Sequence, residues 1–152
     1  MSKELIAVAQ NWASHDPDLK TKKQVEELIA NNNIEKLSEL FAGDLEFGTA
    51  GLRAEIDAGQ SRMNRAVVLR ATYGLCQYLL KKYPNKKPKL IVANDARHMS
   101  DQFAQDVCGV ATALGLEVFR LPSNLPTPVL AFGVRHIGAD AGVMITASHN
   151  PP

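Results

Sequence analysis

Several features that would point to a particular class of protein are scarce or absent in this sequence. Its 152 residues include only two cysteines, and 17 Lys and Arg nearly balance 16 Asp and Glu, for a net charge of +1. No stretch approaches the roughly 18 apolar residues of a membrane span, and residues 1–20 lack the apolar core of a signal peptide. We therefore expect no nucleic acid and no membrane as partner, and a cytoplasmic location.

The two cysteines, Cys76 and Cys108, lie in apolar stretches with helical spacing. This placement predicts small buried side chains rather than a disulfide or a catalytic thiol. Three of the histidines, His15, His98 and His136, do not have the spacing of metal ligands. The chain is 45% hydrophobic, which is enough for a core, and its length suits one domain.

The first 43 residues are predicted to be mainly helical. Apolar residues recur at helical spacing between Glu4 and Ser14. Thr21 and Gln24 have the spacing of a capping box that would open a second helix. A short third helix is expected from about residue 34 to residue 41, before Gly43 ends the pattern. The sequence thus divides into an N-terminal helical extension, residues 1–43, and a domain, residues 44–152.

From residue 44 onward, strand patterns alternate with helix patterns. Asn64 and Ser100 are good N-caps for two of the intervening helices, and Thr127-Pro128 is a good start for the third. The expected strands are Leu45–Ile56, which two glycines interrupt, Lys89–Asn94, Leu116–Leu121 and about Ala141–Thr146. This order predicts an α/β fold with a mixed, mostly parallel four-stranded sheet between helices.

Four loops are candidates for a functional site, because such sheets bind ligands at the carboxyl ends of their strands. Asp95 and Arg97, in the second loop, are spaced to form an ion pair that holds the loop. Thr127, in the third, is a candidate for a polar contact. The loops are Gly48–Arg53, Asp95–Ser100, Ser123–Thr127 and Thr146–Pro152.

The last loop, with the sequence T-A-S-H-N-P-P, is the most informative segment. Its residue types alone fit an ordinary polar turn, ended by the two prolines, as well as they fit a functional loop. The whole pattern, however, closely resembles the phosphoserine loop of the α-D-phosphohexomutases, the phosphoglucomutase and phosphomannomutase family. The first loop, E-F-G-T-A-G-L-R ending at Arg53, resembles the F-G-T-(A/S)-G-L-R segment of the same family.

The resemblance implies a role for four residues. Ser148 would carry the phosphate as a serine ester and, through that phosphate, supply one ligand to Mg²⁺. His149 would orient the phosphate or move a proton, which imidazole can do near neutral pH. Arg53 would bind phosphate oxygens through its planar fork of donors, and Thr49 would contact the substrate nearby. The candidate catalytic residues are therefore Ser148, His149 and Arg53.

The resemblance also implies an activity that this chain does not contain in full. Members of the family have four domains and move phosphate between the C1 and C6 hydroxyls of a hexose through a bisphosphorylated sugar. The chain would then be a first-domain fragment, inactive alone, because the acidic metal loop and the sugar-selecting loop lie beyond Pro152. Its expected partners are a sugar phosphate, a sugar bisphosphate and the remaining domains. Glucose ranks first, and a phosphopentomutase acting on ribose or deoxyribose phosphates is the alternative.

Other classes fit the sequence less well. A serine hydrolase would need a G-x-S-x-G elbow, whereas Ala147 and His149 flank Ser148. A dinucleotide-binding domain would need G-x-G-x-x-G after the first strand, and the segment Gly48–Gly51 does not match it. A non-catalytic interaction module stays open as a third possibility.

Overall fold

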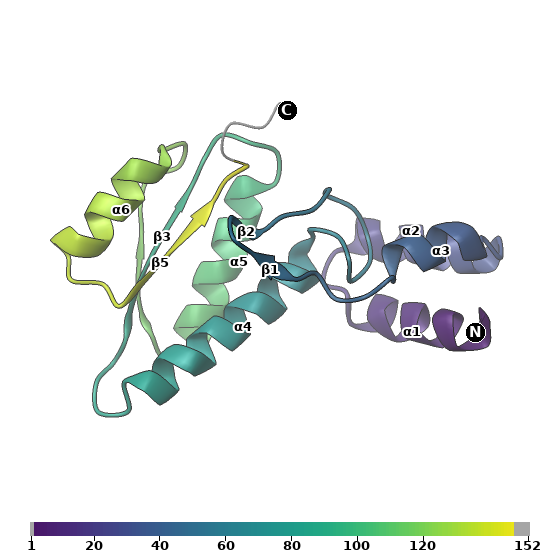
Figure 1. The fold of residues 1–152 in the computed structure, drawn as a ribbon, viewed down its shortest axis with the longest axis horizontal. Coiled ribbons are helices and arrows are strands. Elements are labelled where there is room, and N and C mark those ends of the chain that lie inside the picture. Colours follow the sequence, from purple (N-terminus) through teal and green to yellow (C-terminus); the bar gives the residue numbers. More distant parts are fainter. Residues whose placement is uncertain (1, 148–152) are drawn as a thin grey trace. The chain divides into compact units, whose positions relative to one another are not determined.

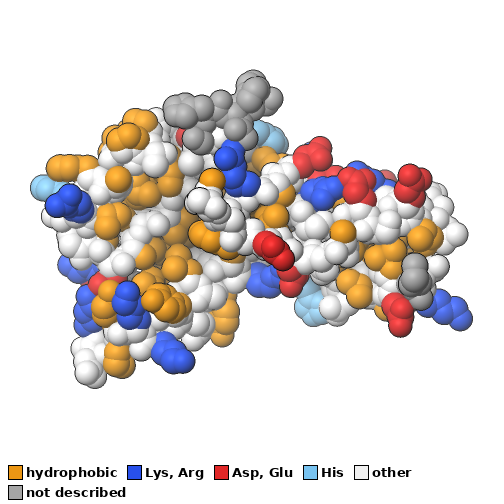
Figure 2. Space-filling view, in the orientation of Figure 1, with side chains coloured by type: hydrophobic (Ala, Val, Ile, Leu, Met, Phe, Trp, Pro, Cys, Tyr) orange, Lys and Arg blue, Asp and Glu red, His pale blue; other side chains and the backbone are white. Residues whose placement is uncertain are grey.

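The structure, a computed structural model, describes residues 2–147 (Figure 1). The chain divides into two compact units, Met1–Val68 and Leu69–Pro152. On the face that Figure 2 displays, acidic and basic side chains are interspersed among hydrophobic ones. None of the described helices is both long enough and apolar enough to cross a membrane.

The first unit contains the three N-terminal helices that the sequence predicts. They are α1 (Ser2–His15), α2 (Leu19–Ala30) and α3 (Ile34–Leu40). The rings of Trp12 and Phe41 meet edge to face, with centroids 5.8 Å apart. One core joins the helices to a residue well beyond them, Ala58, and its buried members are Ala9, Ala13, Val25, Leu37, Leu40, Phe41 and Ala58.

The start of α2 differs from the prediction. Asp18 is its N-cap, because the Asp18 carboxylate accepts a hydrogen bond from the N–H of Lys20 at 2.9 Å. The Thr21 hydroxyl instead donates to the Asp18 carbonyl oxygen at 3.2 Å, and the Gln24 side chain donates to Asp57 at 2.6 Å. The predicted capping box is therefore wrong, since a nearer carboxylate caps the helix and tertiary packing supplies Gln24 with another acceptor.

The strand expected over Leu45–Ile56 is also different. Its two glycines break it into an antiparallel hairpin, β1 (Phe47–Gly48) and β2 (Gly51–Leu52), in which Phe47 pairs with Leu52. Gly51 has φ +90°, a left-handed conformation that favours glycine directly after the turn. The chain reverses here, so this segment pairs with itself instead of adding a fourth strand to the parallel sheet.

The second unit confirms the α/β fold and the parallel sheet. The order of its three strands is β4 (Glu117–Arg120), β3 (Lys89–Asn94) and β5 (Ala141–Ile145), and both pairings with β3 are parallel. Figure 1 shows α5 (Ser100–Ala113) and α6 (Thr127–His136) on opposite sides of this sheet. Ile91 and Ala93 of β3 pack with Leu130 of α6. The almost wholly buried β3 explains why its sequence is an apolar run rather than an alternating one.

The helix α4 (Arg65–Lys82) begins at the predicted cap, Asn64. The Asn64 Oδ1 accepts a hydrogen bond from the N–H of Val67 at 3.0 Å. Its Nδ2 donates to the carbonyl oxygens of Asp57, at 2.9 Å, and Gly59, at 2.7 Å. Asn64 is only 3% exposed, so one buried amide satisfies both the helix start and the turn before it.

Both cysteines are free thiols, as predicted. Cys76 is fully buried and Cys108 is half-buried. Burial raises the pKa of both thiols, although the Arg120 charge opposes the shift at Cys108. Neither environment favours the thiolate that a nucleophile would need.

We predict that Asn64→Ala lowers the free energy of unfolding by about 2–4 kcal/mol, because it removes an N-cap and leaves a buried and a part-buried carbonyl oxygen without this donor. Urea denaturation measures the change. The control is Asn33→Ala, which removes the N-cap of α3, where Asn33 Oδ1 accepts from the N–H of Lys36 at an exposed position. Equal losses in the two variants would show that the buried contacts of Asn64 contribute nothing beyond capping.

Candidate active site

The carboxyl ends of β3 and β5 lie side by side, as the parallel sheet requires. Asn94, the last residue of β3, pairs with Ile145, the last residue of β5. The N–H of Asp95 then donates to the Ile145 carbonyl oxygen at 3.0 Å. The sheet thereby brings the predicted Asp95 loop next to the first residues of the T-A-S-H-N-P-P loop.

The Asp95 carboxylate joins three segments at this edge. Its Oδ1 accepts hydrogen bonds from the Ser100 hydroxyl at 2.7 Å and from the N–H of Arg97 at 3.0 Å. Its Oδ2 accepts from the N–H of Ala147 at 3.3 Å. Ala147 directly precedes Ser148 in the sequence. The carboxylate thus holds the end of β3, the start of α5 and the start of the serine loop together.

The predicted ion pair in this loop is present, but the predicted cap is not. The Arg97 Nε lies 3.7 Å from Asp95 Oδ2. Met99, with φ +63°, is the N-cap of α5 and makes no side-chain capping bond. The Ser100 hydroxyl, which the sequence offers as a cap, is directed to Asp95 instead. The hydroxyl therefore donates to the nearby half-buried Asp95 carboxylate and does not cap the helix.

The environment of Asp95 favours its charged form. Burial raises the pKa of this carboxyl, but hydrogen bonds from Ser100, the Arg97 N–H, the Thr146 side chain and the Ala147 N–H outweigh burial and hold the pKa below its ordinary value. Asp95 is therefore a carboxylate at neutral pH and accepts hydrogen bonds with both oxygens. It acts on the loop by orienting backbone and hydroxyl donors.

The third predicted loop reaches the same edge of the sheet. The N–H of Leu125 donates to the Asn94 carbonyl oxygen at 3.1 Å, and α6 begins at Thr127 with Pro128 in its first turn, as predicted. The Asn94 side chain is 1% exposed, and its Oδ1 has no hydrogen-bond partner in the described part of the chain. The sequence motifs do not point to Asn94, although an amide at the end of an apolar strand is a signal for a residue at this edge.

The other predicted site residues fall in two places. Thr49 lies in the turn between β1 and β2, and Arg53 directly follows β2; both side chains are exposed and belong to the first unit. Ser148 and His149 lie outside the described residues, which end at Ala147. The roles of Thr49, Arg53, Ser148 and His149 stay predictions.

Comparison with known proteins identifies the family. A family model described as phosphoglucomutase/phosphomannomutase, alpha/beta/alpha domain I, matches residues 44–152. The chain belongs to the phosphoglucomutase/phosphomannomutase family. Its match begins at residue 44, whereas the compact units divide at Val68. The first part of the family domain is therefore built onto the same unit as the N-terminal helices.

The relatives of this chain are named for different sugars. Human phosphopentomutase is 40% identical over 147 residues, which cover 92% of this chain and 24% of that protein. The phosphoglucomutase of Staphylococcus epidermidis is 36% identical over 141 residues, 93% of this chain and 25% of that protein. A crystal structure from Thermus thermophilus, of a protein provisionally named a phosphomannomutase, matches 72% of this chain and 24% of its own with a TM-score of 0.65 and 35% identity. The chain thus spans about a quarter of the length of these relatives.

The described residues of this family member do not form a metal site by themselves. Among residues 2–147, no three His, Cys, Asp or Glu side chains gather where a metal ion could bind. The Asp95 carboxylate at the edge of the sheet already accepts hydrogen bonds with both oxygens.

We predict that Asp95→Asn destabilises the protein by about 1–3 kcal/mol at neutral pH, because an amide cannot accept from all of these donors with both terminal atoms. The folded-state pKa of Asp95 lies below its unfolded value, so its contribution is present above that unfolded value and is lost as the pH falls through the folded-state pKa. The difference in unfolding free energy between wild type and variant should shrink below about pH 4.

Unfolding followed by circular dichroism across this pH range measures the effect. Asp101→Asn serves as the control, because Asp101 is also close to the start of α5 but its side chain is 66% exposed. A difference that does not change with pH would contradict the ionised role of Asp95.

Proposed function

We propose that this chain is the phosphate-carrying first domain of a sugar-phosphate mutase. The reaction moves phosphate between the C1 and C6 hydroxyls of a hexose, by way of a phosphoserine at Ser148 and a bisphosphorylated sugar. The observation that carries the proposal is the T-A-S-H-N-P-P sequence directly after β5. Asp95 holds the start of this segment at the carboxyl edge of the sheet, by accepting a hydrogen bond from the N–H of Ala147. Parallel α/β sheets bind their ligands at this edge.

The proposed chemistry uses the serine ester as a store of phosphate. A sugar hydroxyl oxygen attacks the phosphorus, the bond between phosphorus and the Ser148 oxygen breaks, and the hydroxyl proton passes to the serine oxygen. The bisphosphorylated sugar then reorients in the site, and its other phosphate is transferred to Ser148 by the reverse step. His149, next to the ester in sequence, would orient the phosphate or carry the proton.

The hairpin would supply the phosphate contacts. Arg53 presents a planar fork of donors suited to phosphate oxygens, and its exposed side chain follows β2 directly. Gly48 and Gly51 lack the Cβ atoms that would keep an anion away from the backbone N–H groups. Thr49, exposed in the turn, is the further substrate contact.

Magnesium is part of this proposal, with Ser148 as the one ligand from this chain. When bound, the ion would neutralise charge on the transferring phosphoryl group. Since the described residues form no acidic metal cluster, the other ligands would come from the rest of the enzyme. We accordingly expect the 152-residue chain alone to be inactive.

A phosphopentomutase is the second candidate, favoured by the human relative that carries this name. Both activities would use the same phosphoserine, so the residues of this chain serve either one. Turnover of glucose 1-phosphate and ribose 1-phosphate by the full-length protein, compared at equal concentrations, distinguishes the two. A preference for the pentose would replace the hexose in the proposal and leave Ser148 in its role.

Ser148→Ala in the full-length enzyme should lower mutase turnover by several orders of magnitude, because no oxygen remains to carry the phosphate. A coupled assay measures turnover, and intact-mass analysis measures phosphate on the protein. Ser38→Ala, which alters an exposed serine of α3, is the control. Near-normal turnover in Ser148→Ala would sink the proposed function.

Arg53→Ala should cost on the order of 2–4 kcal/mol of transition-state stabilisation, because charge-assisted hydrogen bonds to phosphate are lost. Arg53→Lys should recover only part of this stabilisation, since a lysine keeps the charge but not the planar fork of donors. The measurement is kcat/KM for the sugar phosphate, with Arg135→Ala, at an exposed arginine of α6, as control. Unchanged kinetics with altered stability would make Arg53 a structural residue.

A further inference from the structure

The two ends of the β1–β2 hairpin are held by one short segment. Before the hairpin, the N–H of Leu45 donates to the Gln60 carbonyl oxygen at 3.2 Å. After it, the N–H of Met63 donates to the Glu55 carbonyl oxygen at 2.9 Å, and the N–H of Asp57 donates to the Met63 carbonyl oxygen at 3.2 Å. The loop that contains Thr49 and Arg53 therefore leaves from, and returns to, a hydrogen-bonded base.

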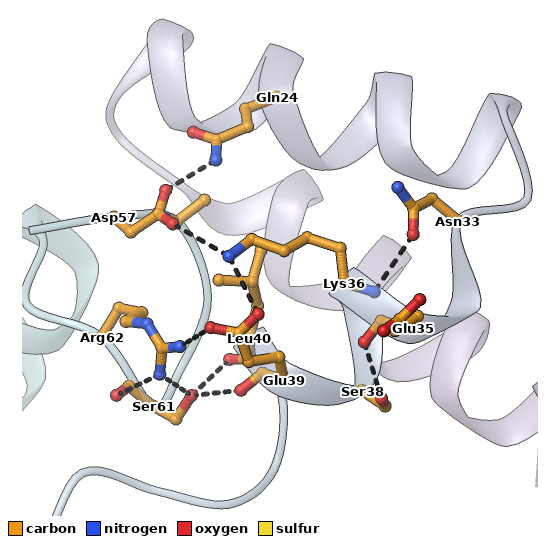
Figure 3. Close-up of polar contacts among 11 residues, drawn as sticks. Gln24, Asn33, Glu35, Lys36, Ser38, Glu39, Leu40, Asp57, Ser61 and Arg62 are labelled. Atoms are coloured by element: carbon orange, nitrogen blue, oxygen red, sulfur yellow. Dashed lines mark hydrogen bonds and ion pairs between the residues drawn. The ribbon is translucent and has the colours of Figure 1, made fainter. Parts of the chain in front are cut away.

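This base is fastened to the carboxyl end of α3. The N–H of Ser61 donates to the Leu40 carbonyl oxygen at 3.2 Å, and the Ser61 hydroxyl donates to the carbonyl oxygens of Leu40, at 2.8 Å, and Glu39, at 3.0 Å. The Arg62 guanidinium pairs with the Glu39 carboxylate, as Figure 3 shows. Leu40 is fully buried in the helical core, so these bonds connect the base to the buried core of the unit.

The backbone at Gly59 lies too close to α3 for any side chain. A Cβ on this glycine would lie 2.4 Å from the Leu40 carbonyl oxygen and 2.8 Å from the Leu40 Cβ. Its φ of +97° also favours glycine. The neighbouring Ala58 is fully buried in the same core. The position of the base is thus set by close packing as well as by hydrogen bonds.

The returning end of the hairpin is held a second time, through Asp57. Its Oδ1 accepts from Gln24 of α2 at 2.6 Å and from the N–H of Ala58 at 2.8 Å. Its Oδ2 lies 4.0 Å from the Lys36 ammonium of α3, which also pairs with Glu39 at 3.0 Å (Figure 3). Two helices therefore hold the chain only four positions after Arg53.

We propose that the N-terminal helices α2 and α3 position the Thr49–Arg53 loop for the sugar phosphate, through a clamp formed by Gln24, Lys36, Glu39 and Leu40 on residues 57–62. The inference rests on the proposed role of Arg53 and extends it to residues that do not touch the substrate. Each of these clamp contacts is at the base of the hairpin and away from its tip. The clamp members are accordingly positioning residues, which act through the orientation of Arg53.

The test variant is Gln24→Ala/Ser61→Ala in the full-length enzyme, which removes one side-chain contact at each end of the clamp without leaving a buried charge unpaired. The control variant is Gln10→Ala/Ser38→Ala, at exposed positions of α1 and α3. We expect the clamp variant to raise KM for the sugar phosphate about three- to tenfold and to speed hydrogen exchange of the backbone amides of residues 47–53. The control should change neither.

The same pair of substitutions made in Arg53→Ala distinguishes positioning from general destabilisation. If the clamp acts mainly through Arg53, most of its effect on KM should disappear in that background and leave only the part due to Thr49, whereas independent effects would add in full. A full additional increase would overturn the proposal. So would normal hydrogen exchange of residues 47–53 in the clamp variant, whatever the kinetics.

The outcome also separates this inference from the proposed function. Arg53→Ala that turns over normally would remove Arg53 from the substrate site and, with it, the kinetic role of the clamp. If Arg53→Ala lowers turnover but the clamp variant matches its control in KM and in hydrogen exchange, the result would overturn the clamp and leave the proposed function intact.

Discussion

The Asp95 carboxylate is the group on which the candidate site depends most directly. It accepts hydrogen bonds from a hydroxyl at the start of α5 and from the backbone N–H that immediately precedes Ser148. Without it, both donors would lose this charged acceptor at a half-buried position, which costs free energy. The parallel pairing of β3 and β5 explains why one side chain can serve both segments, since their carboxyl ends meet at the same edge.

The two loops with expected chemistry are held in the same manner. The serine loop is fixed at its start by Asp95, and the arginine loop is fixed at its base by contacts with Leu40 and Asp57. In both cases, buried or half-buried groups at the base make the bonds. Such an arrangement limits the freedom of the loop at its base.

The family domain and the compact units of the structure have different boundaries. The family model begins at residue 44, yet residues 44–68 belong to the compact unit that contains the N-terminal helices. The core of this unit includes Ala58, and Gly59 packs closely against Leu40 of α3. The chain spans about a quarter of the length of its relatives.

The sequence by itself determined most of the helices and strands, because their signals are local. The run Lys89–Asn94 matches β3 at both ends, and Asn64 caps α4 as its position before a helical pattern predicts. The T-A-S-H-N-P-P and F-G-T-A-G-L-R segments identified the family for the same reason, since a motif is a property of neighbouring residues.

Only the tertiary structure decided which partner each polar group takes. Ser100 bonds to Asp95 instead of capping α5, Gln24 bonds to Asp57 instead of closing a capping box, and the first predicted strand turns back on itself at Gly51. Each of these outcomes depends on an acceptor or a packing surface far away in the sequence, or on a competition between nearby groups that the fold resolves. Hydrogen bonds form between groups that lie close together in space, and the periodicity of the sequence does not show which distant residues the fold brings together.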